Sequence, residues 1–534
     1  MIRFFKIFIC GLVSGGIAAT LSSCDDYLDV LPDNRAELDS DTKITELLVN
    51  AYPLTNYFLV AEMFSDNTDH CTGSSSYTAF NNSGTTLHEE AANWKDITDK
   101  YQDSPSALWE HCYRSIAAAN NVLIAIDEMG NPQRLSAQRG EALLCRAYCH
   151  FLLGNIFCLP YSTRTSQQAM GVPYMRTTES EVAPVYSRGT MEELYRSIAA
   201  DIEEGLPLID DNLYTVPKYH FNLRAAYAFA ARFYLYYMHD DLSNLDKCID
   251  YSSRVLTSQP AEMMRDWQTL GNIALGSASY NAFIDASQKA NLLIVTTNSY
   301  WEWVYGPTAV GKGYCHNTKI ASTETLQSTG FWGSQNTYFK AGQMQGSPKS
   351  YMLKMGQYVE YTDVVNGIGS PRMIVPAFTT DALVLDRAEA YALKGDYAHA
   401  YADLTTWMNA FTANQGIVDA AMLNAAYGPQ KAYYTPTSPT PKKHLQPDFT
   451  VTPGEQENLI HAVLHARRVT TLHEGLRWQD VKRYGIEIYR RNVDGTLGDG
   501  NITVYDTMTK DDPRRAIQLP PYVITAGITA NPRN

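Results

Sequence analysis

The chain has 534 residues, enough for several domains, and carries 43 Lys or Arg against 57 Asp or Glu, a formal net charge of −14. No basic patch stands out in this acidic chain, which excludes nucleic acid from the expected partners. The 36 Tyr, 17 Phe and 8 Trp residues exceed the needs of a helical core. They indicate a water-facing aromatic surface that recognises a ligand.

Residues 1–23 have the pattern of a secretory signal. Arg3 and Lys6 form its basic end, residues 7–19 form its apolar stretch, and Leu-Ser-Ser precedes Cys24. The apolar stretch is too short for a transmembrane helix. The ending resembles a bacterial lipobox, so we expect lipid attachment at Cys24 and a stable membrane anchor. An ordinary cleaved signal followed by a chance cysteine is the alternative.

The remaining cysteines and histidines predict neither a disulfide framework nor a metal site. An odd number of Cys remains beyond Cys24, without regular spacing, and no CxxC or HExxH motif occurs. Cys145, Cys149 and Cys158 have the character of small buried apolar side chains. The stretch Asp-Asn-Thr-Asp-His at 66–70 lacks the spacing and glycine of an EF-hand loop. We therefore expect no metal and no cofactor.

Two helices are predicted after a polar, loop-like region at residues 66–103. Ser104 followed by Pro105 predicts a helix start, with the helix ending near Met129. Residues 139–160 are apolar almost all the way round, which predicts a core helix capped by Ser136 and ended by a proline.

Further helices are predicted in pairs. Thr190 and Glu193 form a capping box for a helix reaching about Leu208, while residues 221–238 alternate Ala with aromatics and Ser243 opens the next helix. Small residues at helical spacing let two helices approach closely. Residues 388–404 have the offsets of a tetratricopeptide helix pair, although Trp407 stands where a small residue is usual. Any helix–turn–helix is the alternative for this unit.

Helical periodicity disappears between residues 270 and 380, where only residues 292–297 predict a strand. A structureless stretch this long is usually functional. An aromatic face can receive the C–H patch of a pyranose while nearby polar groups take its hydroxyls. The predicted ligand-binding residues are Trp301, Trp303, Trp332 and Tyr338 from this stretch, with Trp94, Tyr77 and Asp66 from residues 66–103. The alternative is that these aromatics merely anchor a large loop.

The C-terminal part predicts one long structural helix. Thr-Pro-Gly-Glu at 452–455 has the pattern of a capping box with Pro at the first helical position. The helix is expected to continue into residues 467–485, a segment rich in Arg. Buried arginines need carboxylate partners, and Glu474 and Asp480 are available for that role. Trp478 is expected in the core of this block.

Two of these segments resemble the SusD/RagB family of surface glycan-binding lipoproteins from Bacteroidetes-type bacteria. Residues 141–153 read E-A-L-L-x-R-A-Y-x-H-F-L-L, which resembles the central helix of that family. Residues 467–485 pair two arginines with E-G-x-R-W-x-D-x-x-R-x-G, the stronger match. Ala466 and Thr470-Thr471 depart from the family pattern, which puts the ion pairs of that helix in doubt.

The resemblance implies a mainly α SusD-like fold: tetratricopeptide-like helix pairs, a loop-rich ligand-binding region and a few short strands. The implied regions are 24–260, 261–376 and 377–534, within one compact body. The implied function is non-catalytic capture of an oligosaccharide or polysaccharide and its delivery to a SusC-like TonB-dependent transporter. Asp25 and Asp26 resemble the signal that sends such lipoproteins to the cell surface, so an outer-membrane location is expected.

Two alternative functions remain open, one with a different cargo and one with a different chemistry. The first keeps the family and replaces the glycan by a peptide. The second is a lipid-anchored glycoside hydrolase, which would need two carboxylates flanking a cleft. The carboxylates available for it in the polar regions are Asp66, Asp69, Glu302 and Asp363.

Overall fold

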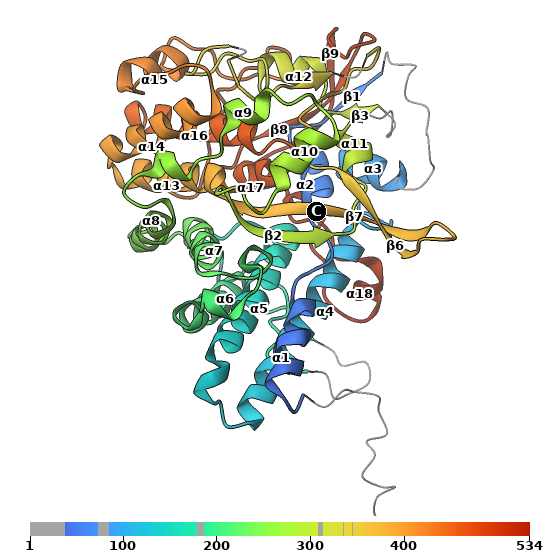
Figure 1. Ribbon diagram of the computed structural model, residues 1–534. Coiled ribbons are helices and arrows are strands. Elements are labelled where there is room, and N and C mark those ends of the chain that lie inside the picture. Colours follow the sequence, from blue (N-terminus) through green and yellow to red (C-terminus); the bar gives the residue numbers. More distant parts are fainter. Residues whose placement is uncertain are drawn as a thin grey trace, which may run out of the picture. The chain divides into compact units, whose positions relative to one another are not determined.

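Helices packed in pairs are the main element of the structure, a computed structural model that describes residues 38–72, 85–178, 186–307, 313–334, 336–343 and 345–533. From Ser40 onward the chain forms one unit (Figure 1). The predicted signal, Cys24 and Tyr77 lie outside the described residues. The expected fold class, mainly α with a few short strands, is confirmed.

The helix pairs follow the chain and pack on one another. α4 packs on α5, α5 on α6, α7 on α8, α13 on both α8 and α14, and α16 on α13 and α15. Their bounds are α4 Pro105–Glu128, α5 Ser136–Phe157, α6 Met191–Gly205, α7 Leu223–Tyr236, α8 Ser243–Leu256, α13 Thr380–Lys394, α14 Tyr397–Phe411, α15 Ala420–Tyr427 and α16 Glu455–Thr470.

The shorter helices lie between or beside these pairs. They are α1 Asp41–Leu48, α2 Phe58–Phe64, α3 Thr85–Ala92, α9 Trp267–Gly271, α10 Ser277–Ile284, α11 Trp301–Tyr305, α12 Thr318–Thr323, α17 Leu476–Arg483 and α18 Pro521–Thr525. Four of them, α9 to α12, fall in or beside the stretch expected to be without helices. Helices this short carry too few residues for a helical period to show in the sequence.

Two predicted helix starts are confirmed in atomic detail. The Ser104 hydroxyl accepts the Ala107 N–H at 3.2 Å, with Pro105 opening α4. The Thr190 hydroxyl accepts the Glu193 N–H at 3.1 Å, and the Glu193 carboxylate accepts the Thr190 N–H at 2.8 Å. These interactions satisfy backbone donors that a helix start otherwise leaves without partners.

Two other predicted starts are wrong. A turn of 3₁₀ helix precedes α5, so Leu135 rather than Ser136 occupies its cap position. α16 begins at Glu455, directly after Gly454 with φ +102°, instead of at Pro453. The long helix expected to follow is also interrupted, since α16 ends at Thr470 and α17 starts after Gly475. Gly475 has φ +76°, a left-handed conformation that glycine adopts without steric cost.

The predicted tetratricopeptide-type pair is formed by α13 and α14. Gly395, with φ +79°, ends α13 and reverses the chain. Trp407 stands on α14 and points into the core, where its indole N–H donates to the Thr470 hydroxyl at 2.8 Å. The large side chain therefore joins α14 to α16, which is why this end of the repeat departs from the usual small residue.

Three small sheets complete the fold. β2, which confirms the predicted strand, pairs antiparallel with β7, and β7 pairs antiparallel with β6. β1 pairs antiparallel with β3 and parallel with β8, and β9 completes that sheet. The strands are β1 Asp69–Cys71, β2 Asn291–Thr297, β3 Tyr314–Cys315, β4 Gly342–Gln343, β5 Ser350–Tyr351, β6 Gln357–Asp363, β7 Ile368–Thr379, β8 Ile488–Val493 and β9 Ile502–Met508.

The regions expected at 24–260, 261–376 and 377–534 interleave in space. The mixed sheet brings together early, middle and late strands, and α13 packs on α7 and α8. Near the end of the chain, the Asn531 amide donates to the carbonyls of Phe157 and Ile517, both at 2.9 Å. Arg188 Nη1 donates hydrogen bonds to the same segment, to Thr529 O at 3.1 Å and to Asn531 Oδ1 at 2.7 Å.

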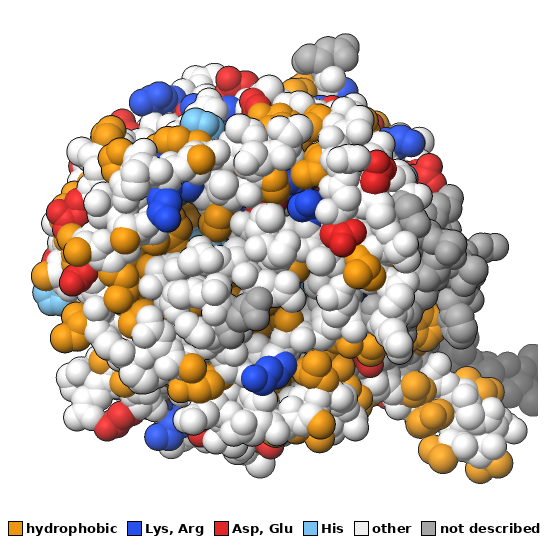
Figure 2. All heavy atoms as spheres, turned by 90° about the horizontal axis from the view of Figure 1, so that it is seen from above, with side chains coloured by type: hydrophobic (Ala, Val, Ile, Leu, Met, Phe, Trp, Pro, Cys, Tyr) orange, Lys and Arg blue, Asp and Glu red, His pale blue; other side chains and the backbone are white. Residues whose placement is uncertain are grey.

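The hairpin of β6 and β7 extends beyond the helices (Figure 1) and carries an apolar tip. Figure 2 shows apolar side chains gathered on a projecting lobe, on the side where Figure 1 draws this hairpin. The exposed apolar residues of the hairpin are Val359, Tyr361, Val364, Val365 and Ile368. Within the described part of the chain, no helix combines the length and apolarity that a membrane crossing requires.

Candidate ligand-binding site

Three of the predicted ligand-binding tryptophans are core residues. Trp94, Trp301 and Trp332 expose only 3%, 0% and 1% of their surface. The prediction that these rings form a water-facing platform is therefore wrong. Trp332 packs edge-on against Phe331 and Trp407, with both centroid separations at 5.1 Å.

Trp94 is held between two guanidinium groups. Its ring lies under Arg490 at 4.2 Å and Arg514 at 5.3 Å, and its indole N–H donates to Phe64 O at 2.9 Å. Its φ of +52° is rare for a side chain of this size. The negative face of the Trp94 ring stabilises the guanidinium groups of Arg490, which is buried, and of Arg514, which is partly buried. Trp94 thus anchors the early segment to the C-terminal strands.

Asp66 also has a structural role. Its carboxylate accepts two hydrogen bonds from Arg477, at 2.7 and 2.8 Å, and lies 3.3 Å from Lys443 Nζ. Burial alone would raise the pKa of Asp66, but Arg468, Arg477 and Lys443 together hold that pKa well below its usual range. A carboxylate so fully engaged has no oxygen left for a ligand.

The arginine-rich block confirms one expected partner and corrects the other. Asp480 accepts a hydrogen bond from Arg467 Nη1 at 2.8 Å. Glu474 instead pairs with the buried Lys354. Trp478 is fully buried, as expected.

A half-buried aromatic stack remains at α11. Tyr300 and Trp303 stack with their centroids 5.0 Å apart and their planes 24° apart. The intervening Trp301 points the other way, into the core, and its indole N–H donates to His473 O at 2.6 Å. One buried ring therefore fixes the short helix, while the rings on either side of it in sequence reach the surface.

The start of α11 is fixed by the buried Asp103. Its carboxylate accepts the Tyr300 N–H at 2.7 Å and the Ser299 hydroxyl at 2.5 Å. Burial raises the pKa of Asp103 to about 6, although both hydrogen bonds oppose that rise. The Tyr300–Trp303 stack is thus mounted on a backbone with little freedom to move, which lowers the entropy cost of binding.

Polar groups from α10 and β6 adjoin this stack. Glu302 accepts the backbone N–H of Gln357, and burial raises the pKa of its carboxyl. Burial is the larger cause of the raised pKa values of Tyr280 and Tyr358. The nearby charge of Glu302 raises both further. Tyr358 donates its hydroxyl to Asn281. We call Tyr280, Tyr300, Glu302, Trp303 and Tyr358 the α11 surface.

Of this surface, the sequence prediction named Trp303 as a ligand-binding residue and Glu302 only as a carboxylate for the hydrolase alternative. Tyr338 is half-buried, but its backbone N–H donates to Phe411 O at 3.1 Å at the end of α14, a different part of the fold. Tyr280 and Tyr358 were missed. The signal for Tyr358 was available, because β6 is an exposed strand that carries tyrosines at both 358 and 361.

The α11 surface can offer a sugar ring an aromatic face and a few hydrogen-bonding groups, as carbohydrate recognition requires. Of the four carboxylates considered for a hydrolase, only Glu302 belongs to it. Asp69, like Asp66, is paired with a buried arginine, Arg491, at 2.7 and 2.8 Å. Asp363 lies in the hairpin turn, where it accepts from Val365 and Asn366. Among the residues described, no three His, Cys, Asp or Glu side chains gather as metal ligands.

Comparison with known proteins identifies the fold. A family model described as "Starch-binding associating with outer membrane", of the SusD-like type, matches residues 26–235. No curated protein sequence matches the chain.

Solved structures match over almost the whole length. A SusD superfamily protein from Bacteroides thetaiotaomicron shares 16% identity, covers 92% of this chain and 98% of its own, and has a TM-score of 0.60. A SusD superfamily protein from Bacteroides vulgatus shares 17% identity, with 92% and 98% covered and a TM-score of 0.58. A SusD-like carbohydrate binding protein from Bacteroides vulgatus shares 15% identity, with 85% and 84% covered and a TM-score of 0.53. Together with the family match over residues 26–235, these show that the chain has the SusD-like fold.

Proposed function

We propose that the protein captures a glycan at the α11 surface without cleaving it. The observation that carries this proposal is the Tyr300–Trp303 stack, two half-buried rings mounted on an anchored helix. The SusD-like fold and the starch-binding description of the matching family support it.

The proposed contact places the C–H face of a sugar on the ring of Trp303 or Tyr300. Such an aromatic contact contributes about 0.5–1.5 kcal/mol beyond the area it buries. Glu302, Tyr280 and Tyr358 would receive hydroxyls at the ring edge. Glu302 would act here as a hydrogen-bonding group, because hydrolysis needs a second carboxyl group about 5–10 Å away. Among the five residues of the α11 surface, Glu302 is the one carboxylate, and the nearby Asp103 is buried and occupied by Ser299 and Tyr300.

The proposed setting is the outer surface of the outer membrane. Lipid attachment at Cys24 would anchor the chain, and a SusC-like TonB-dependent transporter would receive the cargo. Both ideas rest on the lipobox-like residues 21–24 and on the family resemblance. The description of the matching family, which names association with the outer membrane, supports the location.

The test is a binding titration of the purified chain against soluble starch, maltoheptaose and a wider glycan panel. Trp303→Ala and Tyr300→Ala should each weaken binding to the glycan that wild type recognises by about tenfold or more. The matched control is Tyr251→Ala. It removes one ring of another half-buried stack, Tyr227–Tyr251 with centroids 5.7 Å apart, which belongs to α7 and α8. This control should bind like wild type.

Three outcomes would overturn the proposal. Wild-type affinity in both α11 variants would show that the glycan binds elsewhere. Binding to unstructured peptides but to no glycan would establish the peptide alternative. Release of shorter products in proportion to the amount of pure protein would show that the protein is an enzyme.

A further inference from the structure

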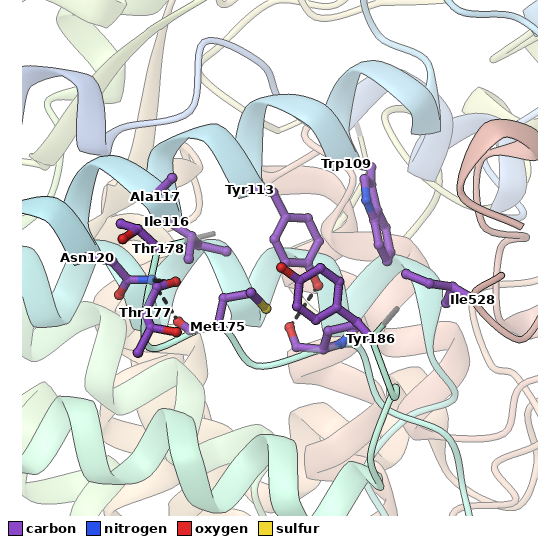
Figure 3. Close-up of a pocket in the computed structure, with 11 residues that line it drawn as sticks. Trp109, Tyr113, Ile116, Ala117, Asn120, Met175, Thr177, Thr178, Tyr186 and Ile528 are labelled. Carbon is purple, nitrogen blue, oxygen red and sulfur yellow. Dashed lines mark hydrogen bonds between the residues drawn. The ribbon is translucent and has the colours of Figure 1, made fainter. Parts of the chain in front are cut away.

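A cavity lies beside α4, apart from the α11 surface. It has a volume of about 330 Å³ and opens between α4 and the segment around residues 173–178 (Figure 3). We call it the α4 pocket. Its lining residues are Trp109, Tyr113, Ile116, Ala117, Asn120, Pro173, Met175, Thr177, Thr178, Tyr186 and Ile528. None of them belongs to the α11 surface.

Among the described residues that line the α4 pocket, none has a charged side chain. Moving a charged ligand from water into such a pocket would remove its hydration without supplying a partner of opposite charge, which is costly. The ligand that fits is therefore uncharged. This excludes phosphates, carboxylates and amines as the buried part of a ligand.

The polar groups on the inner wall are already engaged by the protein. The Tyr113 hydroxyl donates to Pro173 O at 2.8 Å. The Asn120 amide donates to Met175 O at 3.1 Å and Thr177 O at 3.3 Å, and its oxygen accepts from Arg146 at 2.9 Å. Figure 3 shows the bonds of Tyr113 to Pro173 and of Asn120 to Met175 and Thr177. A bare sugar would find few donors on this inner wall, because the Tyr113 hydroxyl and the Asn120 amide already give their hydrogens to the protein, a cost that disfavours it.

The remaining lining suits a ring. Trp109 and Tyr113 lie 4.8 Å apart and tilted by 46°, and Tyr186 faces the same space with Ile116, Met175 and Ile528 (Figure 3). Aromatic faces of this kind pack offset or edge-on against another ring. Cavities that bind small molecules begin at about 300 Å³ and are mostly apolar, which is the case here.

The wall is preorganised by a buried ion pair. Arg146, which holds the Asn120 oxygen, also pairs with Asp201 through Nε at 2.6 Å and Nη2 at 2.8 Å. Asn120 in turn fixes the carbonyls of Met175 and Thr177. The pocket therefore needs little reordering when a ligand enters.

We propose that the α4 pocket binds a small, uncharged apolar ring compound, aromatic or alicyclic. The ring lies between Trp109, Tyr113 and Ile528, and any polar substituent points out past Ala117 and Thr177 at the exposed mouth. This site is separate from glycan capture and does not depend on the proposed function.

The test uses N-phenyl-1-naphthylamine, a neutral probe whose fluorescence rises when it leaves water. The purified chain should bind it saturably. Ala117→Phe places a ring in the mouth from an exposed helix position and should weaken binding by about tenfold or more. Ala398→Phe, at an exposed position on α14, makes the same change away from the pocket and should bind like wild type. Thermal melts confirm that both variants fold.

Two further measurements test the chemistry. 8-Anilino-1-naphthalenesulfonate has the same ring skeleton with a charge added, and it should bind the α4 pocket much more weakly. Maltoheptaose should not displace the neutral probe. Equal probe affinity in Ala117→Phe and wild type, equal sensitivity of the charged probe to Ala117→Phe, or displacement by maltoheptaose would each overturn the proposal.

Discussion

The carboxylate of Asp66 accepts hydrogen bonds from Nε and Nη2 of Arg477 at 2.7 and 2.8 Å, although 411 residues separate the two. Both side chains are buried, and Lys443 and Arg468 lie on the same carboxylate. The pair ties the segment after α2 to the start of α17. Asp66 therefore joins an early segment of the chain to a late one.

Arg477→Ala should lower the free energy of unfolding by about 3–5 kcal/mol, because it leaves a buried carboxylate without its main partner. Urea or guanidinium unfolding measures the loss. Arg254→Ala is the control, since Arg254 pairs with Asp250 on an exposed helix surface and its loss should leave the unfolding midpoint nearly unchanged. Similar losses in the two variants would contradict the structural role of Asp66.

Trp301→Ala and Trp303→Ala should separate stability from binding. Removing the fully buried Trp301 should cost about 3–5 kcal/mol of stability, as should removing the fully buried Trp478. Trp303→Ala should lose glycan affinity with a much smaller change in melting temperature. Thermal melting of the three variants checks this, and an early melt of Trp303→Ala alone would show that Trp303 is the structural ring.

Acid should destabilise the protein in part through Glu324. Burial would raise its pKa, but Lys443, Arg468 and Arg491 outweigh burial and lower it from 4.5 to about 2. A carboxylate with a depressed pKa contributes stability that is present above pH 4.5 and lost as pH falls towards 2. Unfolding midpoints should therefore fall over this range, and less steeply in Glu324→Gln than in wild type. Parallel pH profiles for the two proteins would disprove this contribution.

Glu62 should have the opposite effect on how stability depends on pH. Burial raises its pKa from 4.5 to about 7, despite hydrogen bonds from Asn67 and the Gly475 N–H. The folded state therefore keeps a proton that the unfolded state has lost, so this group reduces stability as pH rises from 4.5 to 7. Glu62→Gln is neutral at every pH. Its stability relative to wild type should grow across that window and level off above pH 7, which denaturant titrations at several pH values can measure.

Cys24→Ala should release the protein from the membrane fraction without unfolding it, because Cys24 precedes Ser40, where the packed unit begins. Fractionation of cells lacking the transporter, followed by a melt of the released protein, checks both parts. Continued sedimentation of the variant with the outer membrane would rule out Cys24 as the only anchor.

Local features were predictable from the sequence because their partners are close in the chain. The caps at Ser104 and Thr190 each bond a residue three positions away, and Gly395 ends its helix by its own conformation. The helix pairs followed from such signals together with helical periodicity.

The burial of the tryptophans could not be predicted in the same way. Trp301 and Trp303 are two residues apart in a five-residue helix, too short to show which side faces the core. The ring of Trp301 is buried by a partner at His473, 172 residues further on. Trp94 depends likewise on Arg490 and Arg514. Sequence composition identified the segments rich in aromatics, while distant contacts decided which rings reach the surface.

Asn531 and Arg188 both reach the end of α5. The Asn531 amide donates to Phe157 O, the last carbonyl of α5, which the helix itself leaves without a partner. Arg188 Nη2 donates to the same carbonyl at 3.4 Å. The segment at residue 531 thus caps a helix that ends 374 positions earlier in the chain. Loss of Asn531 would leave this buried carbonyl with one long hydrogen bond, so the residues around 531 contribute to the stability of the central helix.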